Sequence, residues 1–295
     1  MIISIASGKG GTGKTIVATS LALYLIKSGI ETGFLDCDVE EPNSALLLKP
    51  VINETQTVGI PVPVIDFKKC TYCGKCAEVC VYHAIAVAKE TVLVFPELCH
   101  GCGGCALFCP EEAISEVNRD IGVVEKGNAG EIKFIQGRLN ISEPMAVPLI
   151  REVKRHGTEG NDRVIIVDVP PGTSCPVIEA VRESDFVILV TEPTPFGLND
   201  LKLAVETVKK LDIDFGVIIN RSDIGDKKVE KYCKDENIPI LAEIPYSRNI
   251  AVLYSYGVSM VVEGEKYRRI FHKIWKTIKK LKSGQSWPIV GEKDV

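Results

Sequence analysis

The sequence predicts an α/β fold, a doubly wound and mostly parallel sheet interrupted by a small α+β insertion. Three observations lead to this prediction: β-rich runs without polar alternation recur along the chain, helical stretches separate them, and eight of the eleven cysteines lie within residues 70–109. Unbroken apolar runs are typical of strands buried on both faces of a parallel sheet. Strands that alternate with helices indicate an α/β architecture.

The expected elements alternate over most of the chain. We expect strands at residues 2–6, 33–35, 164–167, 186–190, 216–219 and 238–242, and a strand or hairpin at 130–141. Helical spacing of apolar residues predicts helices at 15–28, 145–155, 199–211, 227–237 and 266–282. Between residues 62 and 117 this rhythm stops. The sequence therefore predicts a discontinuous host domain, residues 1–61 and 118–295, around an insertion at 62–117.

Composition limits the functions to consider. Apolar residues make up 45% of the 295, enough for a sizeable core, and the net charge of -4 gives no reason to expect nucleic acid as a partner. The start of the chain lacks the pattern of a signal peptide, and no apolar run is long enough to span a membrane. We therefore expect a cytoplasmic protein, in which many cysteines point to metal or redox chemistry.

A phosphate-binding loop follows the first expected strand. The pattern G-x-x-x-x-G-K-[ST] is met by Gly8, Lys9, Gly10, Gly11, Thr12, Gly13, Lys14 and Thr15. Glycines let backbone N–H groups turn inward around a phosphate, and the next helix presents its positive N-terminus. Lys14 is expected on the β- and γ-phosphate oxygens and Thr15 on Mg²⁺. The loop thus predicts ATP and Mg²⁺ as ligands.

The cysteines form two copies of C-x₂-C-x₂-C-x₃-C. Runs of this spacing hold [4Fe–4S] clusters in bacterial ferredoxins, with the fourth cysteine of each run on the other cluster. Zinc is the alternative, although structural zinc prefers two separated C-x₂-C pairs. Val81 stands where a proline is expected after Cys80. We expect two clusters, one on Cys70, Cys73, Cys76 and Cys109 and the other on Cys99, Cys102, Cys105 and Cys80.

The chain resembles the P-loop ATPases of the MinD, ParA and Mrp superfamily, which includes the nitrogenase iron protein. The resemblance lies in Lys9 and in the segments 36–38, 164–173 and 220–221. The second lysine in the loop is similar to the family's deviant Walker A motif. By that resemblance, Lys9 reaches the nucleotide of a partner subunit in a nucleotide-dependent homodimer. Asp38 activates the attacking water, and Asp168 holds Mg²⁺ through water. Gly172 senses the γ-phosphate, and Asn220 contacts the base.

The resemblance to members with an inserted ferredoxin domain implies an ATPase that forms ADP and phosphate, slowly and with stimulation by a partner. Nucleotide-gated electron transfer to a redox partner is our first interpretation, and iron–sulfur or metal-cofactor assembly for a client protein is the alternative. Positioning of a partner, as in MinD and ParA, is a third and is disfavoured by the insertion.

Two further features leave alternatives open. Cys175 is expected to be either a buried small apolar residue, which we favour, or a thiolate presented at a dimer seam, whereas Cys37 and Cys233 are expected to be packed thiols. The helix at 266–282 is basic and amphipathic. Because it falls where the last helix should cover the sheet, packing on the core is favoured over membrane binding.

Overall fold

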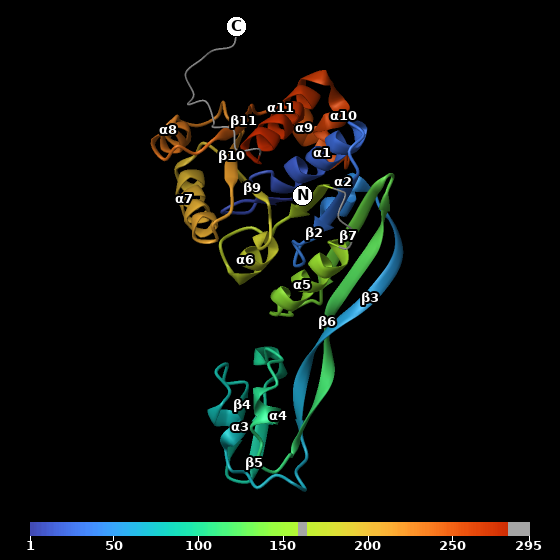
Figure 1. The fold of residues 1–295 in the computed structure, drawn as a ribbon, viewed down its shortest axis with the longest axis vertical. Helices are drawn as coiled ribbons and strands as arrows, with labels where there is room; N and C mark the ends of the chain where they lie inside the picture. Colours follow the sequence, from blue (N-terminus) through green and yellow to red (C-terminus); the bar gives the residue numbers. More distant parts are fainter. Residues whose placement is uncertain (159–163, 283–295) are drawn as a thin grey trace.

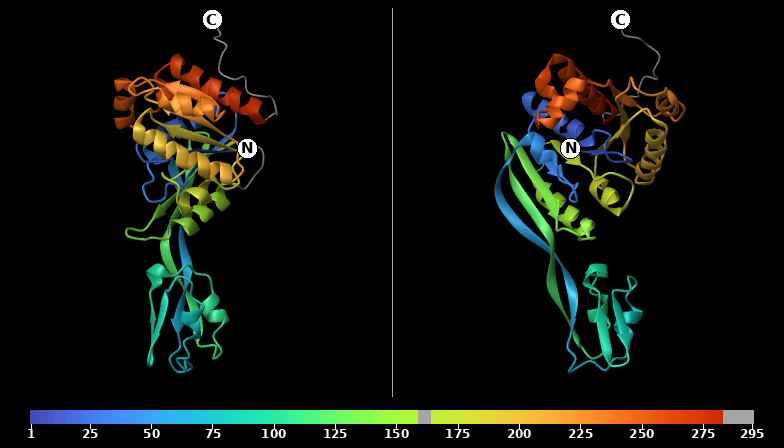
Figure 2. Two further views of the ribbon diagram at one scale, coloured as in Figure 1. Left: turned by 90° about the vertical axis from the view of Figure 1, so that its left-hand side faces the viewer. Right: turned by 180° about the vertical axis from the view of Figure 1, so that it is seen from behind.

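The computed structural model describes residues 1–158 and 164–282. Figure 1 shows an elongated molecule in which a two-stranded ribbon joins a larger α/β body to a small cysteine-bearing body. The two views in Figure 2 show the same separation from the side and from behind.

The larger body is built on a nine-stranded sheet within the described residues, with the order β11-β10-β9-β1-β8-β2-β7-β6-β3. Neighbouring strands from β11 to β7 are parallel, and β6 runs antiparallel to both β7 and β3. The strands are β1 (Ile2–Ala6), β2 (Thr32–Asp36), β3 (Val51–Ile65), β6 (Ile114–Ala129), β7 (Ile132–Leu139), β8 (Val164–Asp168), β9 (Phe186–Thr191), β10 (Phe215–Asn220) and β11 (Ile240–Ile244).

Helices cover both faces of this sheet (Figure 2). Alternate residues of one strand enter different cores: Ile165 and Val167 of β8 belong to one, and Ile166 to the other. This is why the strands read as unbroken apolar runs. The first core is covered by α5 (Ala146–Gly157), α6 (Cys175–Val181), α7 (Pro195–Lys210) and α8 (Lys228–Asp235). The second is covered by α1 (Lys14–Lys27), α10 (Met260–Glu263) and α11 (Glu265–Lys282).

Strands β3 and β6 pair from Val51 with Asn128 to Ile65 with Ile114. The ribbon is the part of this pair at residues 59–65 and 114–121, where β6 has no described strand on its other side because its pairing with β7 begins only at Gly122. The expected boundaries of the insertion, 62 and 117, therefore lie inside these two strands. The small body contains β4 (Ile85–Ala88), β5 (Thr91–Val94), α3 (Lys75–Glu78), α4 (Gly104–Leu107) and the short 3₁₀ helix η1 (Pro96–Leu98).

The expected helix at 266–282 packs as we favoured, with Tyr267, Phe271 and Ile274 buried in the second core. Helix α7 begins at Pro195, earlier than the 199 expected, because the Thr194 side chain accepts a hydrogen bond from Gly197 N and caps the helix. Among the described residues, no helix is both long enough and apolar enough to cross a membrane.

Candidate nucleotide site and cysteine cavities

A cavity of about 400 Å³ lies at the carboxyl edge of the parallel strands. This is the edge where doubly wound sheets bind ligands. Its lining combines residues of the glycine-rich loop with residues that follow β2, β8, β10 and β11. They are Ser7, Gly10, Gly11, Gly13, Lys14, Thr15, Ile16, Asp38, Glu41, Asn43, Pro171, Asn220, Arg221, Pro245, Tyr246, Ser247, Ile250, Ala251 and Tyr254.

The loop between β1 and α1 requires glycine for conformation and for space. Gly13 has φ +93°, in the left-handed region, and a Cβ there would lie 2.5 Å from Asn220 Nδ2. Asn220 Nδ2 in turn donates a hydrogen bond to Thr12 O at 2.8 Å. The end of β10 therefore positions the loop, and Asn220 is already engaged with it.

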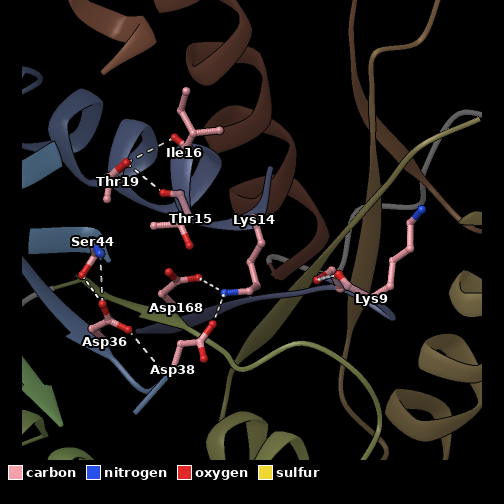
Figure 3. Close-up of polar contacts among 10 residues, drawn as sticks. Lys9, Lys14, Thr15, Ile16, Thr19, Asp36, Asp38, Ser44 and Asp168 are labelled. Atoms are coloured by element: carbon pink, nitrogen blue, oxygen red, sulfur yellow. Dashed lines mark hydrogen bonds and ion pairs between the residues drawn. The ribbon is translucent and has the colours of Figure 1, made fainter. Parts of the chain in front are cut away.

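Lys14 lies between two carboxylates (Figure 3). Its Nζ is 2.8 Å from Asp168 Oδ1 and 3.3 Å from Asp38 Oδ2. Burial by itself favours the neutral amine, but these carboxylates outweigh it and raise the pKa of Lys14. Burial also raises the pKa of Asp38, against the influence of Lys14. The carboxylates thus neutralise the lysine that is expected to bind phosphate.

Asp36 adds a third, fully buried carboxyl group to this edge. It accepts hydrogen bonds from Asp38 N at 3.1 Å and from Ser44 N at 3.2 Å, and also from the Ser44 hydroxyl. Burial, reinforced by the charge of Asp168, raises the pKa of Asp36 to about 7. Asp36 was not predicted as a site residue, although it ends a buried strand two residues before Asp38.

The donor set suits Mg²⁺. Asp168 Oδ2 is buried and has no hydrogen-bond partner, whereas Oδ1 holds Lys14. A buried carboxylate oxygen without a partner is costly, and Mg²⁺ takes oxygen ligands. Thr15 lines the same cavity at the start of α1. Asp168 and Thr15 therefore fit the cation.

Neither Lys9 nor Gly172 is among the residues that line the cavity. The Lys9 side chain points away from the carboxylates around Lys14 (Figure 3). Its Nζ is 3.7 Å from Glu192 Oε2, and the other oxygen of Glu192 accepts a hydrogen bond from Arg221 at 2.6 Å. Gly172 N donates to Ser7 O at 2.9 Å, which joins the segment after β8 to the residue that precedes the glycine-rich loop.

One wall of the cavity was missed by sequence reasoning. It is formed by Pro245, Tyr246, Ser247 and, from α9 (Arg248–Ser255), Ile250, Ala251 and Tyr254. Ser247 caps this helix by accepting a hydrogen bond from Ile250 N. The available signal was the position of this segment after the last strand, at the edge where the loop lies.

Two smaller cavities in the small cysteine-bearing body, called the distal body below, are each lined by four cysteines. One is lined by Cys70, Cys73, Cys76 and Cys109, and the other by Cys80, Cys99, Cys102 and Cys105. The last cysteine of each run thus lines the cavity of the other run. The halves repeat in detail, since Ala84 N lies 3.3 Å from Cys80 Sγ and Ala113 N lies 3.3 Å from Cys109 Sγ.

The chemistry of these cavities suits a cluster. Burial raises the pKa of Cys76, and it raises that of Cys105 to about 11, so both thiols need a metal to ionise near neutral pH. Within residues 1–158 and 164–282, no three His, Cys, Asp or Glu side chains converge closely enough to hold one metal ion. A [4Fe–4S] cube takes one thiolate on each of four irons, so its cysteines surround a cavity instead of a point.

The remaining cysteines divide as follows. Cys37 and Cys233 are buried, as expected, and burial raises the pKa of Cys233 to about 12. Cys175 is exposed, so the buried alternative that we favoured for it was wrong. Pro176 follows it in the first turn of α6, and this turn leaves the side chain outside the core beneath the helix.

The fold and the nucleotide cavity define a P-loop nucleotide-binding protein. The family model of the CobQ/CobB/MinD/ParA nucleotide binding domain matches residues 3–260, so the chain belongs to this family and is a P-loop ATPase. Uncharacterized protein MJ0579 of Methanocaldococcus jannaschii is 32% identical over 262 residues, 88% of this chain and 91% of the relative.

More distant relatives include the iron–sulfur cluster carrier protein of Pyrococcus horikoshii. It is 25% identical over 283 residues, 88% of this chain and 79% of the relative. The solved structure of the septum site-determining protein MinD of the same organism, complexed with Mg-ADP, has a TM-score of 0.58. It shares 20% identity, and the match covers 97% of this chain and 99% of that one. This second likeness shows the fold.

Proposed function

We propose that this ATPase couples its nucleotide state to electron transfer between two [4Fe–4S] clusters and a redox partner protein. The observation that carries the proposal is the gathering of eight cysteines into two cavities with four thiols each, in crossed sets. A crossed arrangement ties each half of the distal body to both clusters, which suits clusters that stay in place. The ribbon joins this body to the sheet that carries the nucleotide cavity.

The nucleotide half of the proposal assigns a role to each residue of the loop and of the strand ends. In the structure, Asp168 and Asp38 are the ion-pair partners of Lys14. When MgATP binds, the phosphates take over Lys14, Asp168 turns to Mg²⁺ with Thr15, and Asp38 is released to orient the attacking water. The products are ADP and phosphate.

The base and the γ-phosphate are assigned to residues at the margins of the cavity. Asn220 contacts the base and Gly172 follows the γ-phosphate. Lys9 leaves Glu192 to reach the nucleotide of a second copy in a nucleotide-dependent homodimer. The 3.7 Å pair with Glu192 is about a third exposed on the lysine side, so breaking it costs at most about 1 kcal/mol.

The iron–sulfur half assigns one cluster to Cys70, Cys73, Cys76 and Cys109 and the other to Cys80, Cys99, Cys102 and Cys105 within an inserted ferredoxin-like domain, residues 62–117. When bound, each cluster supplies one-electron redox chemistry at a potential set by its surroundings. The chain's own contribution is to hold the thiols in place. Backbone N–H groups of Ala84 and Ala113 lie against two of the sulfurs.

A second function is favoured by the relatives named as iron–sulfur cluster carrier proteins, which are 23–25% identical to this chain. In that case the ATPase would deliver clusters to an apo-protein. The two functions differ in what leaves the protein. A carrier loses iron to the acceptor, whereas an electron-transfer protein keeps its iron and changes only its oxidation state.

The deciding experiment uses the full chain purified without oxygen. Iron content and the EPR spectrum of the reduced protein are measured first. The rate of cluster oxidation by a viologen dye is then measured with Mg²⁺, with MgADP and with a non-hydrolysable MgATP analogue. We expect two clusters whose oxidation rate depends on the nucleotide. If the oxidation rate is the same in all three conditions and iron passes to an apo-ferredoxin, the carrier function is the correct one and electron transfer is refuted.

A further inference from the structure

The ribbon leaves the sheet at a β-bulge. The pairing of β6 with β7 ends where Gly122 faces Leu139. At the same point Val58 pairs with Gly122, but Gly59 pairs with Asp120, so Ile121 is an extra residue on β6. A bulge bends its strand and interrupts the ladder of hydrogen bonds. The direction of the ribbon is therefore set at Ile121.

Val39 connects this place to the nucleotide site. It directly follows Asp38 and is 1% exposed. Its carbonyl oxygen accepts a hydrogen bond from Leu139 N at 2.9 Å. Its side chain lies over Gly137, where a Cβ would be 2.5 Å from Val39 Cγ1. Because Gly137 has no side chain, Val39 packs directly on the backbone of β7.

Asp38 is held by Lys14, because its Oδ2 is 3.3 Å from Lys14 Nζ. Phosphate oxygens compete for the same ammonium group, so nucleotide binding weakens the attachment of Asp38. Since Val39 is the next residue, a backbone shift that releases Asp38 also shifts Val39 against β7. Interfaces packed this closely move between discrete arrangements and do not deform smoothly.

The rest of the ribbon's root is held more firmly. Arg119 of β6 forms an ion pair with Glu143, whose Oε1 also accepts a hydrogen bond from Met145 N at 3.0 Å. Leu149 of α5 packs beneath Gly122, where a Cβ would lie 2.9 Å from Leu149 Cδ2. These contacts fix β6 to the loop before α5 and to α5 itself. The bulge at Ile121 lies between these two anchors of β6, at Arg119 and Gly122.

We propose that Val39 transmits the nucleotide state from Asp38 to the bulge at Ile121, so that the ribbon and the cysteine body change position when MgATP binds. This deepens the proposed function by naming how the distal body is regulated, and it rests on that function only for the role of the cysteines. The contacts that carry it belong to β6, β7 and the segment after β2.

Hydrogen exchange measured by mass spectrometry tests the proposal on the full, iron-loaded chain. The observed segments are 59–65 and 114–121, with Mg²⁺ alone and with a non-hydrolysable MgATP analogue. We expect the analogue to change exchange in these segments by about fivefold or more, the lower limit of ordinary coupling between sites. If the exchange rates of both segments are the same with and without the analogue, this measurement on the unmodified chain overturns the proposal.

Val39→Ala removes the contact with Gly137, and Val187→Ala is the matched control. Val187 is also fully buried but lies in β9, which does not border the ribbon. We expect the response to fall below about twofold in Val39→Ala and to persist in Val187→Ala, with similar analogue affinity in both. Equal responses in the two variants would refute the role of Val39. If the protein purified without oxygen holds no iron but its exchange still responds to the analogue, the inference stands and the proposed function is refuted.

Discussion

The crossed assignment of the cysteines predicts which pairs of cysteine substitutions remove one cluster and which remove both. Each cavity has four thiols, so a chain with both clusters holds about eight irons, and loss of one cluster leaves about four. Cys109→Ala removes a thiol from the cavity of Cys70, Cys73 and Cys76. We expect this variant to retain about four irons per chain, because a cube that lacks one thiolate is lost during purification.

Double variants turn this expectation into a test of geometry. Cys70→Ala added to Cys109→Ala affects the same cavity, so the iron content should stay at about four. Cys99→Ala added to Cys109→Ala affects both cavities and should bring the iron content close to zero. Without crossing, the two double variants would give the opposite results.

The assay is colorimetric iron determination on anaerobically purified protein, supported by the EPR spectrum of the reduced sample. Cys233→Ala is the control, because Cys233 is a buried thiol of α8 that lines neither cavity. It should keep the full iron content. Loss of iron from the control, or identical iron content in the two double variants, would refute the reasoning.

Two further predictions concern the nucleotide site. Gly13→Ala should destabilise the empty protein by about 2–3 kcal/mol, since the left-handed backbone costs about 1–2 and the displaced hydrogen bond of Asn220 about 1. Urea denaturation checks this value, and Gly10→Ala, whose Cβ meets nothing within 4 Å, should change stability by less than about 1 kcal/mol. Equal effects would contradict the argument. The pKa of Asp36 is about 7 in the folded protein, against an ordinary value of 3.8, so the native state binds one more proton than the unfolded chain between these two pH values. Without Mg²⁺ or nucleotide, stability should therefore fall by a few kcal/mol at most from pH 4 to pH 8, and Asp36→Asn should flatten this dependence. An unchanged slope in the variant would show that another group is responsible.

The parallel core could be predicted because its strands are buried on both faces and leave a simple apolar signature. The glycine-rich loop and the cysteine runs were equally legible, since phosphate and cluster binding fix both residue type and spacing. The ribbon was not predicted. Strand β3 enters it from the edge of the sheet, where residues 54–57 are Glu, Thr, Gln and Thr, and a segment exposed on both faces has no apolar period.

The parts of the site that escaped prediction depend on tertiary placement. Glu192 and Tyr246 follow different strands and meet the loop only because β9 and β11 lie in one sheet with β1. The exposure of Cys175 could not be read from composition either, because it depends on where α6 begins. Spacing identifies side chains that act through a local motif, whereas the sheet order brings the others together.

The two strands of the ribbon could pair with a strand of another chain. Over residues 59–65 and 114–121 it is only two strands wide, so within the described part of the chain neither strand has a further strand beside it. Pro61 and Pro63 in β3 have no N–H to offer, and Glu116 and Asp120 bring charge to β6. These residues disfavour pairing of the ribbon with a strand of another chain. The same prolines that argue against a central strand are suited to a free-standing one.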